Sequence, residues 1–213
     1  MQEHDHIVRE LLRIKAVQIK TDGYFTWTSG IQSPIYCDNR LTMSYPEVRK
    51  QITTSFIKRM NDLQIKPDMI AGCATAGIPH AAWLADELNL PMIYVRSKPK
   101  GHGKGNQIEG ELESGKQVLV IEDLISTGGS SIEAAQAIEK NGGKVCSVFA
   151  IFTYGLATAE TAFTEAGFSH HTITGFDQLV NALLLDKEIT ENEKQKLLKW
   201  REDLGKINSR FNS

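Results

Sequence analysis

Two adjacent carboxylates follow a strongly apolar segment of this sequence. Val118 to Ile121 is a run of four apolar residues, and Glu122 and Asp123 come directly after it. Such a run is typical of a strand inside a parallel sheet, where charge is hard to accommodate without a partner. The two carboxylates could accept hydrogen bonds from vicinal hydroxyl groups, hold a metal, or stabilise a cation that forms in a transition state.

A small, hydroxyl-rich loop comes after the acids and leads into a helical run from Ile132 to Glu139. The loop reads Ser126-Thr127-Gly128-Gly129-Ser130-Ser131. The first turn of a helix has unpaired N–H groups and the positive end of the helix dipole. Glycines let the backbone approach an anion closely, and the hydroxyls add donors. The loop therefore predicts a cradle for a phosphate monoester.

An ordinary strand-to-helix turn is the alternative interpretation of this segment. Ser130 and Glu133 have the spacing of a capping box, which would explain the serines and glycines. It would not explain two acids after a buried strand. Ligands of open α/β sheets bind at the carboxyl ends of the strands, so we favour a ligand site over a simple turn.

A second segment concentrates positive charge. The ten residues from Arg96 to Gly105 hold four Lys or Arg side chains and one histidine, with glycines at three positions and one proline. Glycine and proline disfavour regular helix, so we expect a mobile basic loop that can fold over a ligand and open again. An exposed, solvated turn is the alternative. We favour a functional loop, because the whole chain has a formal net charge of −2 and its positive charge is gathered here.

The basic loop has the chemistry that a leaving diphosphate requires. Arg96 can bind such a group through two parallel hydrogen bonds, and Lys100 and Lys104 can act as point charges. His102 lies between two glycines among lysines, where a core position is not expected. It could donate a hydrogen bond or a proton.

Composition limits the class of protein. The chain has 213 residues, of which 41% are hydrophobic and 23% charged, as in an ordinary globular protein. The small net charge gives no global attraction to nucleic acid or to an anionic membrane. We expect no signal peptide and no membrane span, and we expect the protein to reside in the cytoplasm. The three cysteines have no CxxC spacing, so we expect neither a disulfide framework nor a zinc site.

Strands and helices are expected to alternate along the chain. Apolar patterns predict strands at 69–71, 91–95, 118–121, 144–152 and 171–174, and helices at 5–19, 45–62, 78–88, 131–141, 157–166, 176–184 and 190–204. Residues 23–36 predict two short strands joined by a turn, which would form a hood. The alternation predicts an α/β fold, an open parallel sheet flanked by helices on both faces. We expect one domain over 1–213, with the N-terminal helix and hood at 1–44, the core at 45–175 and C-terminal helices at 176–213.

Four segments resemble a known family. Residues 118–131 resemble the phosphoribosyl pyrophosphate (PRPP) binding motif of type I phosphoribosyltransferases. The basic loop, with Glu109-Gly110 after it, is similar to the flexible catalytic loop of orotate phosphoribosyltransferases. Residues 25–36 resemble the orotate-binding hood of that family, and residues 72–79 resemble its pyrophosphate loop. The four segments keep the family's order over roughly residues 20 to 155.

The resemblance implies an enzyme of pyrimidine biosynthesis. It would transfer ribose 5-phosphate from PRPP to orotate, giving orotidine 5′-monophosphate and pyrophosphate on the route to UMP. Mg²⁺ would be held through PRPP and water, with no protein side chain as a direct metal ligand. The enzyme would be a homodimer whose catalytic loop reaches the neighbouring subunit's site, and it would bind neither nucleic acid nor membrane.

The resemblance also assigns residues to roles. The catalytic residues would be Glu122, Asp123, Lys100 and His102. PRPP would be bound by Arg96, Lys100, His102, Glu122, Asp123, Leu124, Ile125, Ser126, Thr127, Gly128, Gly129 and Ser130. Orotate would be bordered by Ser126 on one side and by the backbone of Tyr36 and Cys37 on the other.

The sequence departs from the family pattern at three places, and two other functions stay open. Thr28 and Ala76 stand where many members have lysine, and residues 152–155 lack an arginine that some members have. One alternative function is a phosphoribosyltransferase for another base. The other is a PRPP-binding transcription regulator of the same fold. The basic loop followed by Gln107 to Gly110 favours orotate, and the absence of an added basic domain favours an enzyme.

Overall fold

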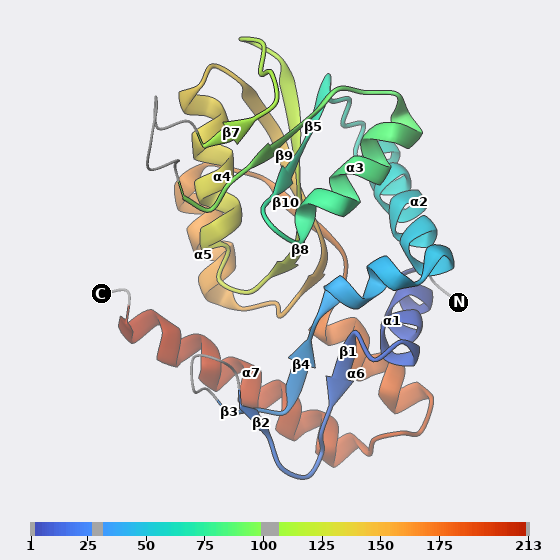
Figure 1. The fold of residues 1–213 in the computed structure, drawn as a ribbon. Coiled ribbons are helices and arrows are strands. Elements are labelled where there is room, and N and C mark those ends of the chain that lie inside the picture. The colour runs from blue at the N-terminus through green and yellow to red at the C-terminus, as the bar shows by residue number, and fades with distance from the viewer. Residues whose placement is uncertain (1–2, 27–31, 99–106, 212–213) are drawn as a thin grey trace.

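A six-stranded sheet forms the centre of the protein, whose computed structural model describes residues 3–26, 32–98 and 107–211 (Figure 1). The strand order is β10-β9-β8-β5-β6-β7. The strands are β5 (Met69–Cys73), β6 (Met92–Val95), β7 (Ile108–Glu109), β8 (Gln117–Ile125), β9 (Lys144–Thr153) and β10 (His170–Gly175). Neighbouring strands of this described sheet are parallel, except that β7 runs antiparallel to β6. The predicted α/β fold with an open parallel sheet is confirmed.

Helices cover both faces of the sheet. They are α1 (Glu3–Arg13), α2 (Pro46–Asp62), α3 (Gly77–Leu88), α4 (Gly129–Lys140), α5 (Ala157–Ala166), α6 (Phe176–Leu185), α7 (Glu191–Phe211) and the 3₁₀ helix η1 (Asn39–Ser44). Figure 1 shows α2 and α3 on one side of the sheet and α4 and α5 on the other. Within the described part of the chain, no helix is both long enough and apolar enough to cross a membrane.

The core has two layers because the central strands are buried on both faces. In β9, Phe149 and Ile151 belong to the cluster shared with α1, α2 and α3, while Val148 and Ala150 belong to the cluster shared with α4 and α5. Side chains of a strand alternate between faces, so a strand covered on both sides reads as a continuous apolar run. That physical link explains why β5, β8 and β9 could be predicted from the sequence.

Most predicted elements are confirmed within a few residues, but the N-terminal helix is shorter than expected. We expected a helix from 5 to 19, whereas α1 ends at Arg13 and Lys15 adopts a left-handed φ of 59°. The following residues form β1 (Val17–Ile19), which pairs antiparallel with β4 (Ile35–Cys37). Tertiary pairing thus overrides a helical apolar spacing that continued to Val17.

The hood contains more strand than was predicted. Besides the ribbon of β1 and β4, β2 (Phe25–Thr26) pairs antiparallel with β3 (Gln32–Ser33). Residues 27–31, which include Thr28, lie outside the described residues. In Figure 1 the hood strands lie beside α7, and the indole N–H of Trp200 donates to the carbonyl of Gln32 at 3.3 Å. The C-terminal helix is therefore packed against the hood.

One further expectation is wrong in detail. The acids do not follow the motif strand but lie within it, because β8 continues to Ile125 by pairing with β9 as far as Thr153. A short strand that was not predicted also joins the sheet, since Ile108 and Glu109 pair with Val95 and Tyr94 of β6.

We predict that two glycines at corresponding helix starts tolerate a methyl group very differently. A Cβ at Gly77 would lie against the Ile121 carbonyl oxygen, whereas a Cβ at Gly129 would meet nothing within 4 Å. Gly77→Ala should lower the free energy of unfolding by about 1–3 kcal/mol through overpacking. The matched control Gly129→Ala should stay within about 1 kcal/mol of the wild type. Urea denaturation measures both, and equal midpoints for the two variants would contradict the close approach of α3 to β8.

Candidate active site

The carboxylate of Glu122 joins the end of β8 to the first turn of α4. This side chain is only 6% exposed. Its Oε1 accepts a hydrogen bond from the main-chain N–H of Asp123 at 3.0 Å, and its Oε2 accepts from the hydroxyls of Ser130 and Ser131, each at 3.3 Å. The capping-box interpretation is wrong, because α4 has no side-chain cap bond at its N-terminus and Ser130 binds the acid instead.

Burial disfavours simultaneous ionisation of the paired acids. It is the largest cause that raises the pKa of Glu122 well above its usual range, and the adjacent charge of Asp123 raises it further. Burial likewise raises the pKa of Asp123, although hydrogen bonds to it and the charge of Arg40 act in the opposite direction. The pair therefore provides a site where a positive charge or hydroxyl donors would be strongly favoured.

The loop after β8 has the geometry of an anion cradle. Gly128 is the residue before α4 and has a φ of 85°, a conformation that favours glycine. A Cβ there would also lie 2.8 Å from the ring of Phe163, so the loop packs tightly against α5. The N–H groups of the first turn of α4 have no partner inside the helix and carry its positive dipole end. The structure thus brings the predicted acids and the predicted phosphate loop together.

A second helix begins beside the same acids. The loop of residues 74–76 joins β5 to α3, and its Ala74 N–H donates to the Val95 carbonyl at 2.9 Å. A Cβ at Gly77, the first residue of α3, would lie 3.3 Å from the Cα of Glu122. Two helix N-termini, those of α3 and α4, therefore flank the carboxylates, which is an arrangement suited to an elongated ligand with two phosphate groups.

Asn39, which no sequence motif marks, holds the backbone of the acidic pair in place. This residue is fully buried, and its side-chain N–H donates to the main-chain carbonyl of Asp123 at 2.7 Å. The hydroxyl of Thr42 donates to the Asn39 carbonyl at 2.5 Å and lies 3.2 Å from Nε2 of His80. Burial lowers the pKa of His80 to about 4, so this link is neutral at pH 7. An isolated asparagine in the sequence has no periodicity or motif that would reveal such a bond.

Of the predicted base-binding residues, Cys37 lies within electrostatic reach of Asp123. Cys37 ends β4, and burial followed by the charges of Asp123 and Asp38 raises the pKa of its thiol. Burial also raises the pKa of Tyr154, with smaller contributions from Cys37, Asp123 and Tyr36. Tyr154 is buried beside the site, and its N–H donates to the Ile125 carbonyl at 3.2 Å. No sequence motif marks Tyr154, which directly follows β9.

Of the basic loop, the structure describes only residues 96–98. Arg96 follows β6, and its guanidinium lies 3.3 Å from the carboxylate of Glu109. The Arg96 N–H donates to the Gln107 carbonyl at 2.8 Å, and the Gln107 side chain donates back to the Arg96 carbonyl at 2.8 Å. Lys100, His102 and Lys104 lie outside the described residues. The diphosphate-binding role of Arg96 stays a prediction.

The described residues offer no protein cage for a metal. No group of three or more His, Cys, Asp or Glu side chains is placed to hold an ion in the part of the chain that the structure describes. Glu122 and Asp123 supply two carboxylates beside a phosphate cradle. Mg²⁺ commonly binds through one or two carboxylates, water and substrate phosphates, so this donor set fits an ion that arrives with a phosphorylated ligand.

Comparison with known proteins agrees with this geometry. A family described as "Phosphoribosyl transferase domain" matches residues 44–161. The chain is 63% identical over 198 residues to the orotate phosphoribosyltransferase of Oceanobacillus iheyensis, covering 93% of this chain and 98% of that protein. It is 54% identical to the orotate phosphoribosyltransferase of Fusobacterium nucleatum, covering 93% and 95%. The crystal structure of orotate phosphoribosyltransferase from Aeropyrum pernix superimposes with a TM-score of 0.74 at 26% identity, covering 83% of this chain and 97% of that one.

The fold, the acidic strand end and the flanking helix N-termini define a phosphoribosyltransferase, a pentosyltransferase enzyme. With relatives this similar over nearly its whole length, the chain belongs to the orotate phosphoribosyltransferase family.

We predict that removing one charge of the pair changes how stability depends on pH. A raised pKa means that the folded protein binds more protons than the unfolded chain, so stability falls as pH rises from the ordinary carboxyl range towards the raised value. In the ligand-free protein, Asp123→Asn should raise the Tm relative to the wild type, and by more at pH 8 than at pH 5.

Thermal unfolding at the two pH values checks this prediction. Asp22→Asn, at an exposed position, is the matched control and should show no such difference. A Tm difference for Asp123→Asn that is the same at both pH values would mean that the two carboxylates do not interact.

Proposed function

We propose that this site transfers ribose 5-phosphate from PRPP to a ring nitrogen of orotate, giving orotidine 5′-monophosphate and pyrophosphate. The observation that carries the proposal is the bonding of Glu122 by the serines of the α4 turn, which holds the acidic pair directly beside the phosphate cradle. We infer orotate as the base and PRPP as the donor from the relatives that are named orotate phosphoribosyltransferase.

The donor is bound from both ends of its sugar. Its 5′-phosphate accepts hydrogen bonds from the backbone of residues 126–130 and from the hydroxyls of Ser126 and Thr127, since the hydroxyl of Ser130 donates to Glu122. Glu122 and Asp123 accept hydrogen bonds from the ribose hydroxyls, and Leu124 and Ile125 supply the connecting backbone. The N-terminus of α3 faces the diphosphate end.

The acids act most strongly when positive charge develops. As pyrophosphate departs, the sugar acquires oxocarbenium character, and a nearby cation favours the ionised form of both carboxylates. Their burial, which raises their pKa in the free enzyme, makes this interaction stronger than it would be in water. The stabilisation therefore grows towards the transition state, which is the condition for faster turnover.

The base lies between the hood and the phosphate loop. Ser126 borders it on one side, and the backbone of Tyr36 and Cys37 borders it on the other. The bond from Asn39 to the Asp123 carbonyl supports this placement, because it ties the turn after Cys37 to the acidic strand. Mg²⁺, held through PRPP oxygens and water, would neutralise charge on the diphosphate.

The basic loop of residues 96–105, called the flap below, completes the site. Arg96, Lys100 and His102 close over the diphosphate, His102 as a hydrogen-bond or proton donor to the leaving group. The paired strands β6 and β7 support this proposal, because they hold the residues on either side of the loop next to each other.

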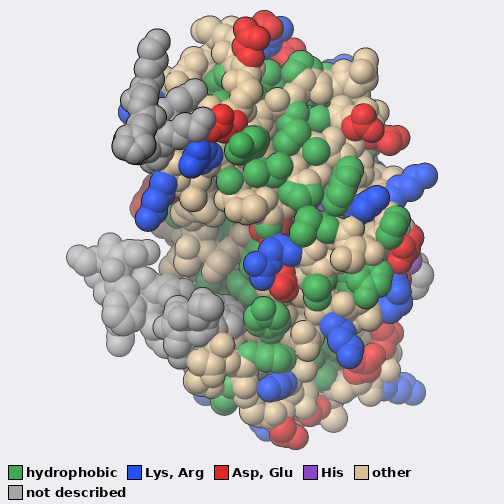
Figure 2. Space-filling view, in the orientation of Figure 1, with side chains coloured by type: hydrophobic (Ala, Val, Ile, Leu, Met, Phe, Trp, Pro, Cys, Tyr) green, Lys and Arg blue, Asp and Glu red, His purple; other side chains and the backbone are tan. Residues whose placement is uncertain are grey.

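The active enzyme is a homodimer in which each subunit's flap reaches the other's site. Two surface features support an interface near the site. Leu41 and Met43 of η1 are exposed apolar side chains. A groove of about 400 Å³ between α2 and α3 is lined by Arg49 and Lys50 opposite Asp86 and Glu87, among others, so two copies can complement each other. Figure 2 shows hydrophobic and charged side chains mixed on this side of the molecule.

A cytoplasmic location fits the three free cysteines.

The function is tested by measuring pyrophosphate release from PRPP and Mg²⁺ with orotate, adenine, hypoxanthine or uracil. We expect release with orotate, and a fall in kcat of more than about tenfold in Asp123→Asn, because one stabilising charge is lost in the transition state. Asp22→Asn should keep wild-type turnover. Release with a purine only would establish the alternative base specificity, and no release with any base would favour the regulator.

Sharing of sites is tested by mixing two inactive variants. Lys100→Ala lacks a flap cation and Asp123→Asn lacks a core acid, so each homodimer should be slow. In mixed dimers one site combines an intact core with the intact flap of the other subunit. An equal mixture, refolded together, should therefore recover about a quarter of wild-type turnover. A turnover equal to the mean of the two separate variants would show that each flap serves its own subunit.

A further inference from the structure

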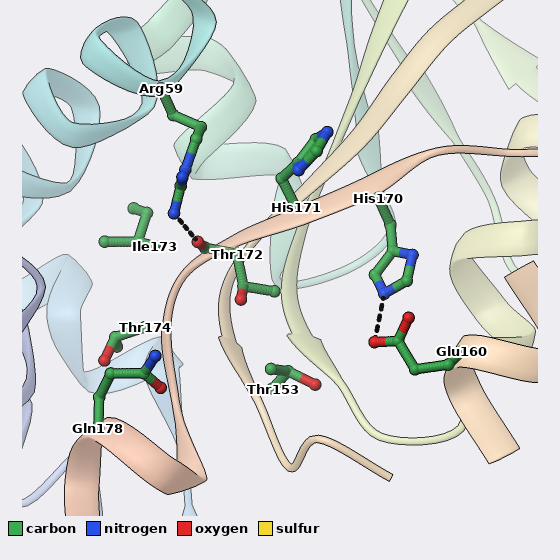
Figure 3. Close-up of a pocket in the computed structure, with 9 residues that line it drawn as sticks. All are labelled: Arg59, Thr153, Glu160, His170, His171, Thr172, Ile173, Thr174 and Gln178. Carbon is green, nitrogen blue, oxygen red and sulfur yellow. Dashed lines mark hydrogen bonds and ion pairs between the residues drawn. The ribbon is translucent and has the colours of Figure 1, made fainter. Parts of the chain in front are cut away.

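A polar pocket lies at the edge of the sheet along β10, which β9 separates from β8 and its acidic pair. It has a volume of about 260 Å³. Its walls come from Arg59 of α2, Thr153 of β9, Glu160 of α5, Gln178 of α6 and the stretch from His170 to Thr174 in β10 (Figure 3). In the described sheet β10 is the last strand, so the pocket lies along an edge that no further strand covers.

One hydroxyl in this pocket is buried without a hydrogen bond. Thr174 is only 2% exposed, and its Oγ1 has no partner among the residues that the structure describes. A buried polar atom without a partner is unfavourable, and native structures rarely keep one without a reason. In Figure 3 Thr174 lies next to Gln178, on the side of the pocket where Arg59 reaches down from α2.

The cationic side of the pocket is already fixed in place. The Arg59 guanidinium donates to the Thr172 carbonyl at 3.1 Å, which uses one of its five N–H donors and holds the group over the edge of β10. Burial is the main cause that lowers the pKa of His171, and the electrostatic influence of Arg59 and the neighbouring His170 lowers it further. His171 is then neutral at pH 7 and can donate through one ring nitrogen and accept through the other.

The opposite side of the pocket carries an acceptor. Nε2 of His170 lies 3.2 Å from the carboxylate of Glu160, and its imidazole ring stacks on Phe163 at 4.1 Å between centroids. Glu160 is exposed and can accept further hydrogen bonds. The pocket therefore has a donor-rich end at Arg59 and Thr174 and an acceptor-rich end at Glu160, as Figure 3 shows.

We propose that this pocket is a second ligand site, which binds a phosphate monoester of a polyhydroxylated molecule. The phosphate lies at Arg59, whose planar fork suits such an anion, and accepts the hydrogen bond that Thr174 cannot give to the protein. Hydroxyl groups of the ligand donate to Glu160. The volume lies just below the range of about 300–1,000 Å³ usual for drug-sized ligands, so the ligand is small, such as a sugar phosphate or a nucleoside monophosphate.

The pocket lies close to the PRPP loop, so a test must distinguish binding in the pocket from binding at the loop. Thr153 in the pocket pairs with Ile125 of β8 on one side and with Gly175 of β10 on the other. The same phosphate esters are also expected to occupy the loop of residues 126–130. Backbone amide NMR shifts distinguish the sites, because residues 170–174 report on the pocket and residues 126–130 report on the catalytic centre.

The experiment titrates the full chain with ribose 5-phosphate, with UMP and with ribose. We expect saturable shifts at residues 170–174 with the phosphate esters and none with ribose. Arg59→Gln and Thr174→Val should each raise the apparent Kd at these residues by at least about fivefold. Thr174→Val loses no protein hydrogen bond, so it should stay folded. Lys58→Gln removes one charge from the neighbouring position of α2, where Lys58 pairs with Asp62 outside the pocket, and should leave the Kd unchanged.

Three results would overturn the proposal. They are shifts confined to residues 126–130, an unchanged Kd in both pocket variants, and equal binding of ribose without phosphate. The phosphate ester with the lower Kd shows whether the ligand is a sugar phosphate or a nucleoside monophosphate. Because the two sets of amides are read separately, loss of binding at residues 126–130 would count against the proposed function and not against the pocket.

Discussion

Keeping two adjacent carboxylates inside the protein is the constraint around which this structure is arranged. Glu122 and Asp123 lie near the end of a strand that is buried on both faces, where Glu122 is almost completely removed from water and Asp123 partly so. The protein compensates with polar contacts, from the serines of α4 to Glu122 and from Asn39 to the backbone of Asp123. These contacts orient the acids but leave their pKa values raised, so the compensation is incomplete.

The parallel sheet makes this arrangement possible. Parallel strands end at one edge, and each following helix begins there with its positive end towards the acids. Glycines allow the close approach, since Gly77 brings α3 against the backbone of β8, and Gly128 turns the chain into α4 against Phe163. The same edge thereby presents negative side chains and positive backbone dipoles, which the proposed function assigns to sugar hydroxyls and to phosphates, in a chain whose formal net charge is only −2.

The sequence predicted the parts of the fold that depend on local pattern. Strands covered on both faces, such as β8 and β9, read as apolar runs, and α2 and α5 show clear helical spacing. The parts it did not predict depend on distant partners. Val17 continues a helical pattern but pairs with Cys37, and Ile108 joins the sheet only because Val95 lies beside it. Of the site, the acids and the phosphate loop follow from one contiguous motif, whereas Asn39 and Tyr154 reach Asp123 from separate segments and carry no local signal.

The incomplete compensation at the acidic pair connects stability with function. A fully neutralised pair, with an arginine beside it for example, would have lower pKa values and a more stable fold, but it would have little attraction left for a developing cation. In the described structure the charge of Arg40 acts on Asp123, but Arg40 itself is held by Asp38 at 2.6 Å. The ligand-free protein therefore retains an unfavourable interaction between the two acids. Under the proposed function, a cationic sugar would relieve this interaction as it forms, so the stability that the fold gives up at the acidic pair would favour the reaction.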